Sequence, residues 1–380
     1  MKRVIKLIII ILLMNILAGC WDRRDIEATV PVLGVGIDFV EEKDRNLTKS
    51  NKVKVTIQVP VPANMEQGEG VVWIISSVGE TVAGAIDNLQ NKLNQELFFG
   101  HLQIIVFSQD IAKEGINKYL NFFRNSAQIR RLSWLLIAED KAEDIIKSEP
   151  KLESIQSVYL THMLNNGVST GRIPDIRLGD FFIRLSNPGE QATAVMLKAD
   201  KEIIDYIGLA VFEGDEFVGS LDQPETLYYQ RALGVPNDTS NLVLACDPTT
   251  EIDRLTIKMQ EVSNKLQPEL KEGKITMKIK LKVEAKVLEQ LNKNNLGREE
   301  VVKQIEMSIE NKLKREIDKV IKKTQSKFQT DIWGFGEYVR AYYPDYWNKI
   351  NWEEEFPKIK INIEVQAYIR QVGMINFTGK

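Results

Sequence analysis

The feature that most constrains the fold is a strict two-residue alternation in the C-terminal half of the chain. From Ile275 to Val287 every second residue is apolar, and the residues between them are Thr, Lys or Glu. Successive side chains of a β-strand point to opposite faces, so this period predicts a strand with one buried and one solvated face. Residues 359–369 repeat the pattern, and residues 255–259 show a shorter version. We therefore expect a mostly antiparallel C-terminal sheet whose apolar face needs a cover.

A helix that could provide this cover is predicted for residues 298–328. Its apolar residues recur at helical spacing along one side: Val302, Ile305, Ile309, Leu313, Ile317, Val320 and Phe328. At 1.5 Å per residue such a helix would run about 45 Å, and we expect it to lie across the sheet. Its cationic residues are interleaved with acidic ones, a pattern more typical of a solvated face than of a partner-binding strip.

The N-terminal half combines strand and helix patterns. Residues 53–59 alternate as a strand and are expected to pair with residues 30–39, whereas apolar residues from Val82 to Leu97 have helical spacing. Another strand is predicted at residues 132–138. Turn-forming residues then crowd between Asn165 and Gly189 and predict a domain break near residue 200. The fold class is therefore α+β, with an N-terminal α/β region at 20–200 and a C-terminal domain at 201–380.

The N-terminus has the pattern of an export signal. Lys2, Arg3 and Lys6 precede residues 7–17, which are apolar except for Asn15. As a helix this run of roughly 11 residues spans about 16 Å, which is shorter than the ~30 Å hydrocarbon core that a transmembrane helix must cross. The segment is therefore predicted to direct export and not to span a membrane.

The four residues Leu17-Ala18-Gly19-Cys20 resemble a bacterial lipobox. In that system the peptidase cuts between Gly19 and Cys20, and the cysteine carries an S-diacylglyceryl group and an N-linked palmitoyl chain. Each buried methylene contributes about 0.8 kcal/mol, so two acyl chains hold a protein that a single chain would hold only marginally. We expect residues 1–19 to be a cleaved lipoprotein signal peptide and Cys20 to be the lipid anchor. The alternative is an ordinary buried cysteine at the end of a signal-anchor helix.

Charge and cysteine content limit the remaining possibilities. Export implies an oxidising compartment, yet Cys246 is the only other cysteine, so no intramolecular disulfide is expected and Cys246 is interpreted as a small buried residue. Removal of Lys2, Arg3 and Lys6 would take the formal charge from −3 to −6. A mildly acidic chain of this kind is not expected to seek nucleic acid or anionic lipid.

No sequence pattern points to catalysis, a cofactor or a metal ion. The two histidines, His101 and His162, have no carboxylate or cysteine at ligand spacing, and Gly34-Val35-Gly36 lacks the third glycine of a phosphate loop. The usual metalloprotease and nucleophile-elbow motifs are absent. A glycosidase pair of carboxylates stays open, because such residues meet only in three dimensions. The chain is predicted not to be an enzyme and to use no cofactor.

Aromatic residues concentrate between residues 331 and 357. Rings of this kind form a small core under loops, which is the interpretation we favour here, or they form a docking surface for a partner. Contact with glycan or lipid is a third possibility. The candidate partner residues are Trp333, Tyr342, Tyr346, Trp347 and Trp352.

Four separated blocks resemble one protein family. The first is GCWDRRDIE at 19–27, and the others are FFGHLQIIVFSQDIA at 98–112, IGLAVFEGDEFVGSLDQPET at 207–226 and DIWGFGEYVR at 331–340. They are similar to blocks of the Ger(x)C family, the C-subunit lipoproteins of bacterial spore germinant receptors. Ser126 and Ser220 stand where that family usually has Pro and Trp. The resemblance is specific because the blocks occur in order behind a lipobox.

The resemblance implies a subunit held by lipid on the outer face of the spore inner membrane. There it would serve spore germination beside membrane-spanning A and B receptor subunits. The family fold implies three mixed domains, each a β-sheet flanked by helices, and hence two sub-domains within 20–200. We expect an interaction protein, because confinement to a membrane raises the effective concentration and a modest interface then suffices.

Two other functions are retained as alternatives. A solute-binding lipoprotein would capture the germinant itself, but such proteins usually have a cleft between doubly wound domains with parallel sheets. The clean alternation of the longest strands argues against that architecture. A hydrolase that degrades the spore cortex is the third class.

Overall fold

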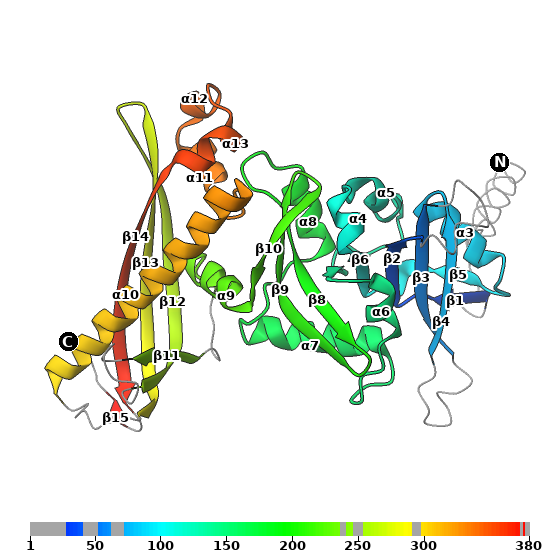
Figure 1. Ribbon diagram of the computed structural model, residues 1–380, viewed down its shortest axis with the longest axis horizontal. Helices are drawn as coiled ribbons and strands as arrows, with labels where there is room; N and C mark the ends of the chain where they lie inside the picture. The colour runs from blue at the N-terminus through cyan, green and yellow to red at the C-terminus, as the bar shows by residue number, and fades with distance from the viewer. Residues whose placement is uncertain are drawn as a thin grey trace, which may run out of the picture.

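The computed structural model describes residues 28–40, 52–61, 72–235, 241–245, 254–290, 298–372 and 375–376. The chain extends along one long axis, with the first strands at one end and the C-terminal sheet at the other (Figure 1). Within the described residues there are sheets of two, eight and five strands, with helices packed beside them. The fold is therefore α+β, as predicted.

The predicted lipid anchor lies outside the residues that the structure describes. This applies to the signal peptide at 1–19, to the cleavage site at Gly19 and to the lipidated Cys20, as well as to Cys246. Among the described helices, none combines the length and the apolar character needed to cross a bilayer.

The largest sheet has eight strands. They are β2 (Gly34–Phe39), β3 (Val53–Pro60), β4 (Val72–Gly79), β6 (Ile104–Ser108), β7 (Trp134–Ala138), β8 (Thr193–Asp200), β9 (Ile203–Glu213) and β10 (Glu216–Asp222). Their order across the sheet is β10-β9-β8-β7-β6-β2-β3-β4. The four central strands run parallel, and the strands on either side pair antiparallel.

Helices cover both faces of this sheet. On one face pack α3 (Val82–Gln90), α4 (Gln109–Lys113), α5 (Asn117–Asn125) and α8 (Leu178–Leu185), and on the other α6 (Ala142–Lys147) and α7 (Gln156–Ser169). The parallel strands β6 and β7 are buried along their whole length, as strands covered on both faces must be. Their short apolar runs carry no alternation, and for that reason the parallel centre of the sheet was not predicted.

The predicted pairing of residues 53–59 with residues 30–39 is confirmed for Gly34–Phe39 by the antiparallel register of β2 and β3, whereas residues 29–31 form a separate short strand. Strand β3 is more buried than its alternation suggests, because Thr56 and Gln58 on its polar side are also buried. The side-chain oxygen of Gln58 accepts a hydrogen bond from the backbone N–H of Ser157 at 3.0 Å. The N-terminal end of α7 therefore covers the face that the sequence pattern assigned to solvent.

The helix predicted over Val82 to Leu97 is shorter than expected. It ends at Gln90, and residues Glu96–Phe98 form a short strand, β5, which pairs in parallel with β1 (Thr29–Pro31). The side chain of Gln90 stabilises the break, because its amide donates to the Gln95 carbonyl and accepts from the Leu97 N–H. Leu97 is buried as predicted, but it reaches the core from a strand.

The C-terminal sheet has five strands. They are β11 (Asn241–Ala245), β12 (Arg254–Lys271), β13 (Lys274–Gln290), β14 (Lys360–Val372) and β15 (Ile375–Asn376). Most neighbouring pairs are antiparallel, as predicted, but β13 and β14 run parallel. The segment between these two strands contains the long helix, so it forms a crossover that returns to the same end of the sheet.

The helix predicted for residues 298–328 is confirmed. It consists of α10 (Glu299–Lys323) followed by a π-helical turn, η4 (Thr324–Phe328), and it lies across the sheet (Figure 1). Its buried residues Ile305, Ile309 and Leu313 join the core formed by the apolar face of the sheet. Glu306 and Glu310, one turn apart, accept hydrogen bonds from the N–H groups of Ile369 and Ala367 in β14 at 2.9 and 3.0 Å. The helix thus satisfies donors that an edge strand would otherwise expose.

The chain passes from the eight-stranded to the five-stranded sheet through α9 (Gln223–Ala232). The strands β9 and β10 follow residue 200 and still belong to the eight-stranded sheet. The domain break at 200 and the division of 20–200 into two sub-domains therefore stay predictions.

Candidate functional site

The aromatic segment 331–357 lies between the two large sheets. It forms α11 (Phe335–Tyr342), α12 (Pro344–Trp347) and α13 (Trp352–Glu355), which sit together at one end of the C-terminal sheet (Figure 1). We call this segment, together with the loop 187–191 that contacts it, the aromatic junction.

Asp331 organises the aromatic junction. Its carboxylate accepts hydrogen bonds from the backbone N–H groups of Trp333 and Gly336 and from the indole N–H of Trp352, each at 2.9 Å. Burial raises the pKa of Asp331 to about 7, although these donors oppose the shift. One buried carboxylate therefore fixes the start of α11 relative to α13.

The aromatic rings pack around this carboxylate. The Trp333 ring stacks on Phe335 with centroids 5.8 Å apart and meets Tyr229 of α9 edge-on at 5.1 Å. The Trp333 indole donates to the Thr324 hydroxyl at 2.9 Å, and the Tyr229 hydroxyl donates to the Ile332 carbonyl at 2.9 Å. Each polar end of these rings thus has a partner, as buried Tyr and Trp side chains require.

Close backbone contact joins the junction to the eight-stranded sheet. The N–H of Gln191, just before β8, donates to the backbone carbonyl of Asp331 at 2.8 Å. Gly189 and Gly336 pack so tightly that a Cβ atom on Gly336 would lie 2.7 Å from the Gly189 Cα and 2.6 Å from the Trp352 indole nitrogen. The junction is therefore a fixed connection between the two halves of the chain.

The candidate partner residues separate into two groups in this structure. Trp333 and Trp352 are only 3% and 5% exposed and belong to the core, where they hold the segment in place. Tyr342 is 64% exposed, and Tyr346 and Trp347 are half-buried beside the core. Tyr342, Tyr346 and Trp347 are the members of the set that a partner could reach, and their role as a partner surface stays a prediction.

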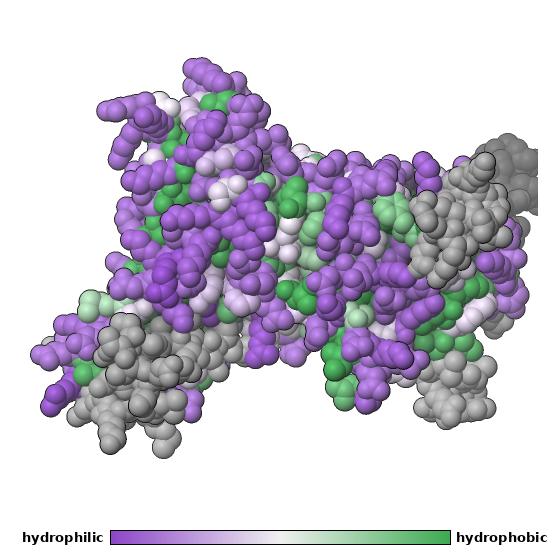
Figure 2. All heavy atoms as spheres, in the orientation of Figure 1, coloured by the Kyte–Doolittle hydropathy of each residue, from purple (hydrophilic) through white to green (hydrophobic). Residues whose placement is uncertain are grey.

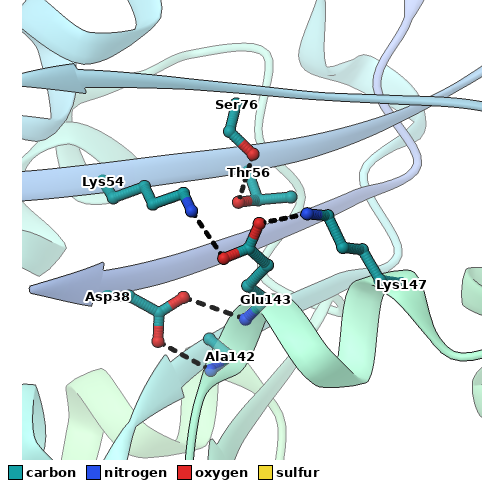
Figure 3. A network of polar contacts seen from close by, with 7 residues as sticks. All are labelled: Asp38, Lys54, Thr56, Ser76, Ala142, Glu143 and Lys147. Atoms are coloured by element: carbon teal, nitrogen blue, oxygen red, sulfur yellow. Dashed lines mark hydrogen bonds and ion pairs between the residues drawn. The ribbon is translucent and has the colours of Figure 1, made fainter. Parts of the chain in front are cut away.

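A second polar network lies at the carboxyl end of β2 (Figure 3). The carboxylate of Asp38 accepts from the N–H groups of Ala142 and Glu143 at 2.7 and 2.9 Å and so caps the start of α6. Glu143 in turn lies between the ammonium groups of Lys54, at 2.6 Å, and Lys147. Burial raises the pKa of Asp38 to about 6 against the opposing effect of the two backbone donors. All of these groups have partners, which identifies the network as a structural link between sheet and helix.

The described residues hold no group of three or more His, Cys, Asp or Glu side chains placed to bind a metal ion. His101 is exposed and contacts the Phe98 ring at 5.8 Å, and His162 is exposed on α7. On the face shown in Figure 2, hydrophilic residues predominate and apolar residues occur in small groups among them.

Neither of the two buried carboxylates, Asp38 and Asp331, was among the residues predicted from the sequence. Asp38 stands within the otherwise apolar strand GVGIDF, and this position is the signal that could have indicated a buried acid. Asp331 gives a weaker signal, because its donors Gly336 and Trp352 come from later turns of an irregular segment.

Comparison with known proteins adds an independent finding. A family model for the spore germination protein N-terminal domain matches residues 22–199, and a second model, described as spore germination B3/GerAC like, C-terminal, matches residues 207–373. The chain is 24% identical over 407 residues to spore germination protein KC of Bacillus subtilis (strain 168), covering 99% of this chain and 97% of that protein. It is also 24% identical over 388 residues to spore germination protein B3 of the same organism, covering 99% and 100%.

A solved structure has the same fold. The crystal structure of the GerBC protein superposes with a TM-score of 0.59 at 20% sequence identity, covering 88% of this chain and 97% of the GerBC chain. The sequence matches and this superposition extend over nearly the whole chain.

Proposed function

Because this chain belongs to the Ger(x)C family of spore germination proteins, we propose that it is a non-catalytic subunit of a spore nutrient germinant receptor, anchored by lipid to the membrane. It acts by contact with the membrane-spanning A and B subunits and is required for germinant-triggered germination. The observation that carries this proposal is the match of both family models, in order, over residues 22–199 and 207–373 behind the lipobox that ends at Cys20.

Two features of the molecule support a role in contact. The buried carboxyl groups of Asp38 and Asp331 both accept hydrogen bonds from backbone or indole N–H groups that hold neighbouring segments of the fold together. The aromatic junction presents Tyr342 at its surface, and exposed aromatic residues are enriched at protein interfaces.

Lipid attachment at Cys20 places the subunit on the outer face of the spore inner membrane. Confinement there raises the effective concentration of the partner subunits, so that a modest interface gives stable association. A similar interface would be too weak for a protein free in solution.

The proposal is tested in spores that carry Cys20→Ala, with Cys246→Ala as the matched control. We expect Cys20→Ala to abolish acylation, to reduce co-purification with the membrane subunits and to slow germination with nutrient. Cys246→Ala should leave all three unchanged. Normal germination and co-purification of the unacylated protein would refute a role for the anchor. Calorimetry of the purified protein with amino acids and sugars is expected to give no binding heat, and millimolar or tighter binding would favour the solute-capture alternative.

A further inference from the structure

The five-stranded sheet has an open face that is rich in lysine. The helices α9, α10 and α11 all pack on the apolar face, which forms one core with them. The other face points away from α10 and carries the alternate residues of β12, β13 and β14. We call it the lysine face, and its cationic members are Lys258, Lys265, Lys278, Lys280, Lys282, Lys286, Lys360 and Arg370.

Strand register brings like charges directly opposite one another on this face. Lys265 pairs with Lys280, and Lys258 pairs with Lys286. Like charges directly opposite in an antiparallel pair destabilise a sheet by up to about 1 kcal/mol. None of these four lysines has an acidic group within ion-pair distance among the residues that the structure describes. The paired lysines thus repel one another and destabilise the sheet, so a role in folding does not explain their presence.

The acidic residues of the same face are fewer than its cations. Glu261 lies opposite Glu284 in the register of β12 and β13, and Glu289 accepts a hydrogen bond from the Thr256 hydroxyl at 3.4 Å. Glu364 binds Lys278 at 2.5 Å, and Glu284 binds both Lys282, at 3.3 Å, and Arg370, at 2.6 Å. Glu269 binds Lys271 at 3.2 Å at the end of the hairpin. An excess of positive charge therefore remains, concentrated on β12 and β13 around Lys265 and Lys280.

The chemistry of this face fits a planar anionic surface. Its cations are almost all lysines, which act as compact point charges, whereas arginine supplies the bidentate geometry that recognises single phosphate or carboxylate groups. The groove on this face is lined mainly by polar and charged residues, among them Lys265, Lys280, Lys282 and Glu364, with Leu281 as the apolar member. Lysines near an anionic bilayer each contribute about 1 kcal/mol of binding without specific contacts.

We propose that the lysine face lies against the anionic headgroups of a phospholipid bilayer. The inference rests on the proposed function in one respect, since the lipid at Cys20 is what holds the chain at a membrane. Figure 1 shows the five-stranded sheet at the opposite end of the molecule from β1. A tether before β1 and the lysine face would therefore hold both ends of the long axis, and the molecule would lie along the membrane. The negative net charge of the whole chain does not indicate this cationic face, because net charge does not report how charge is distributed over the surface.

The test uses the full acylated chain on vesicles, with Cys246→Ser to leave one labelling site. A fluorophore is attached at Gln366→Cys on the lysine face or, as the control position, at Met307→Cys, which is 54% exposed on α10. A quencher is carried by the lipid. We expect quenching at position 366, but not at 307, on vesicles that contain phosphatidylglycerol. It should be weak on pure phosphatidylcholine and should decrease with added salt.

Matched variants distinguish an effect of the lysine face from an effect of the total charge of the protein. The double variant Lys265→Gln/Lys280→Gln removes two cations from the lysine face. Each cation contributes about fivefold, so the equilibrium constant for contact between this face and the bilayer should fall roughly 30-fold. Lys201→Gln with Lys349→Gln removes the same charge from exposed positions elsewhere and should change nothing. Stability in urea should be equal or higher for the first pair, because its like-charge repulsion is removed. A clear loss of stability would instead indicate that these lysines support the fold, and would contradict the inference.

The outcomes distinguish this inference from the proposed function. Retention on phosphatidylcholine reports the tether at Cys20, and phosphatidylglycerol-dependent quenching reports the lysine face. A retained chain with equal quenching on both lipids would overturn the inference and leave the tether intact. A chain that binds only phosphatidylglycerol vesicles, through the lysine face, would overturn the tether alone. If position 366 is shielded in spore membranes but exposed on phosphatidylglycerol vesicles, the partner of the lysine face is an acidic protein. That result would also overturn the inference.

Discussion

Substitution of Asp331 by alanine should destabilise the protein by about 3 kcal/mol at pH 6. Three buried donors, the N–H groups of Trp333 and Gly336 and the indole N–H of Trp352, lose their acceptor. An unpaired buried donor costs about 1–3 kcal/mol, and relief of the buried carboxyl group returns part of that loss. The free energy of unfolding is measured by urea denaturation, followed by circular dichroism so that changes in tryptophan do not affect the signal.

A double-mutant cycle with Trp352→Phe isolates the indole bond. Trp352→Phe alone removes both the donor and part of a buried ring, and we expect it to cost about 2 kcal/mol. In the Asp331→Ala background the donor is already unpaired, so the same change should cost less, which gives a coupling energy of about 1 kcal/mol. Additive effects, or a loss below 1 kcal/mol for Asp331→Ala, would refute the view that this carboxylate organises the aromatic junction.

Three further predictions concern packing, the sheet edge and pH. Gly336→Ala should cost about 1–3 kcal/mol, because its Cβ would lie 2.6 Å from the Trp352 indole nitrogen, whereas Gly84→Ala in α3 should be neutral or stabilising; urea denaturation of both variants checks this. Glu306→Ala with Glu310→Ala should cost about 2 kcal/mol and increase aggregation measured by light scattering, since the two N–H groups of β14 lose their acceptors; unchanged stability would contradict the edge contact. Stability should fall as pH rises from about 4 to 7, because folded Asp38 and Asp331, with pKa values of about 6 and about 7, keep protons that the unfolded chain has already lost. Urea denaturation at a series of pH values should show a flatter profile for Asp38→Asn and for Asp331→Asn, and wild-type stability that rises over this range would contradict the burial effect.

The sequence pattern was sufficient to predict the helices and strands that have one solvated and one apolar side. The alternation around Ile275–Val287 and the helical stripe through Ile309 and Leu313 predicted β13 and α10, because each element buries a single face. The strand predicted at residues 132–138 is confirmed by β7, but β6 and β7 are covered on both sides and show no alternation from which their parallel pairing could be predicted. The helical spacing also led to the prediction of a helix as far as Leu97, because Leu97 is buried and continues that spacing.

Features that depend on contacts between distant segments of the chain could not be predicted from the sequence pattern. The parallel pairing of β13 with β14 depends on the crossover through α10, and the contacts of Asp331 depend on how an irregular segment folds back on itself. The aromatic content of 331–357 correctly indicated a packed cluster, but spacing could not separate the buried Trp333 from the exposed Tyr342. The lysine face required the pairing of Lys265 with Lys280, which net charge cannot show.

The central claim, that this protein works by contact with membrane subunits of a germinant receptor, is tested most directly by photo-crosslinking in spores. A photoreactive residue replaces the exposed Tyr342, and the control replaces Leu152, which is 89% exposed on the eight-stranded half of the molecule. We predict covalent adducts with a multi-span receptor subunit from position 342 and few from position 152. Spores in which position 342 gives no protein adduct, and in which loss of the whole chain leaves the nutrient response unchanged, would contradict the account.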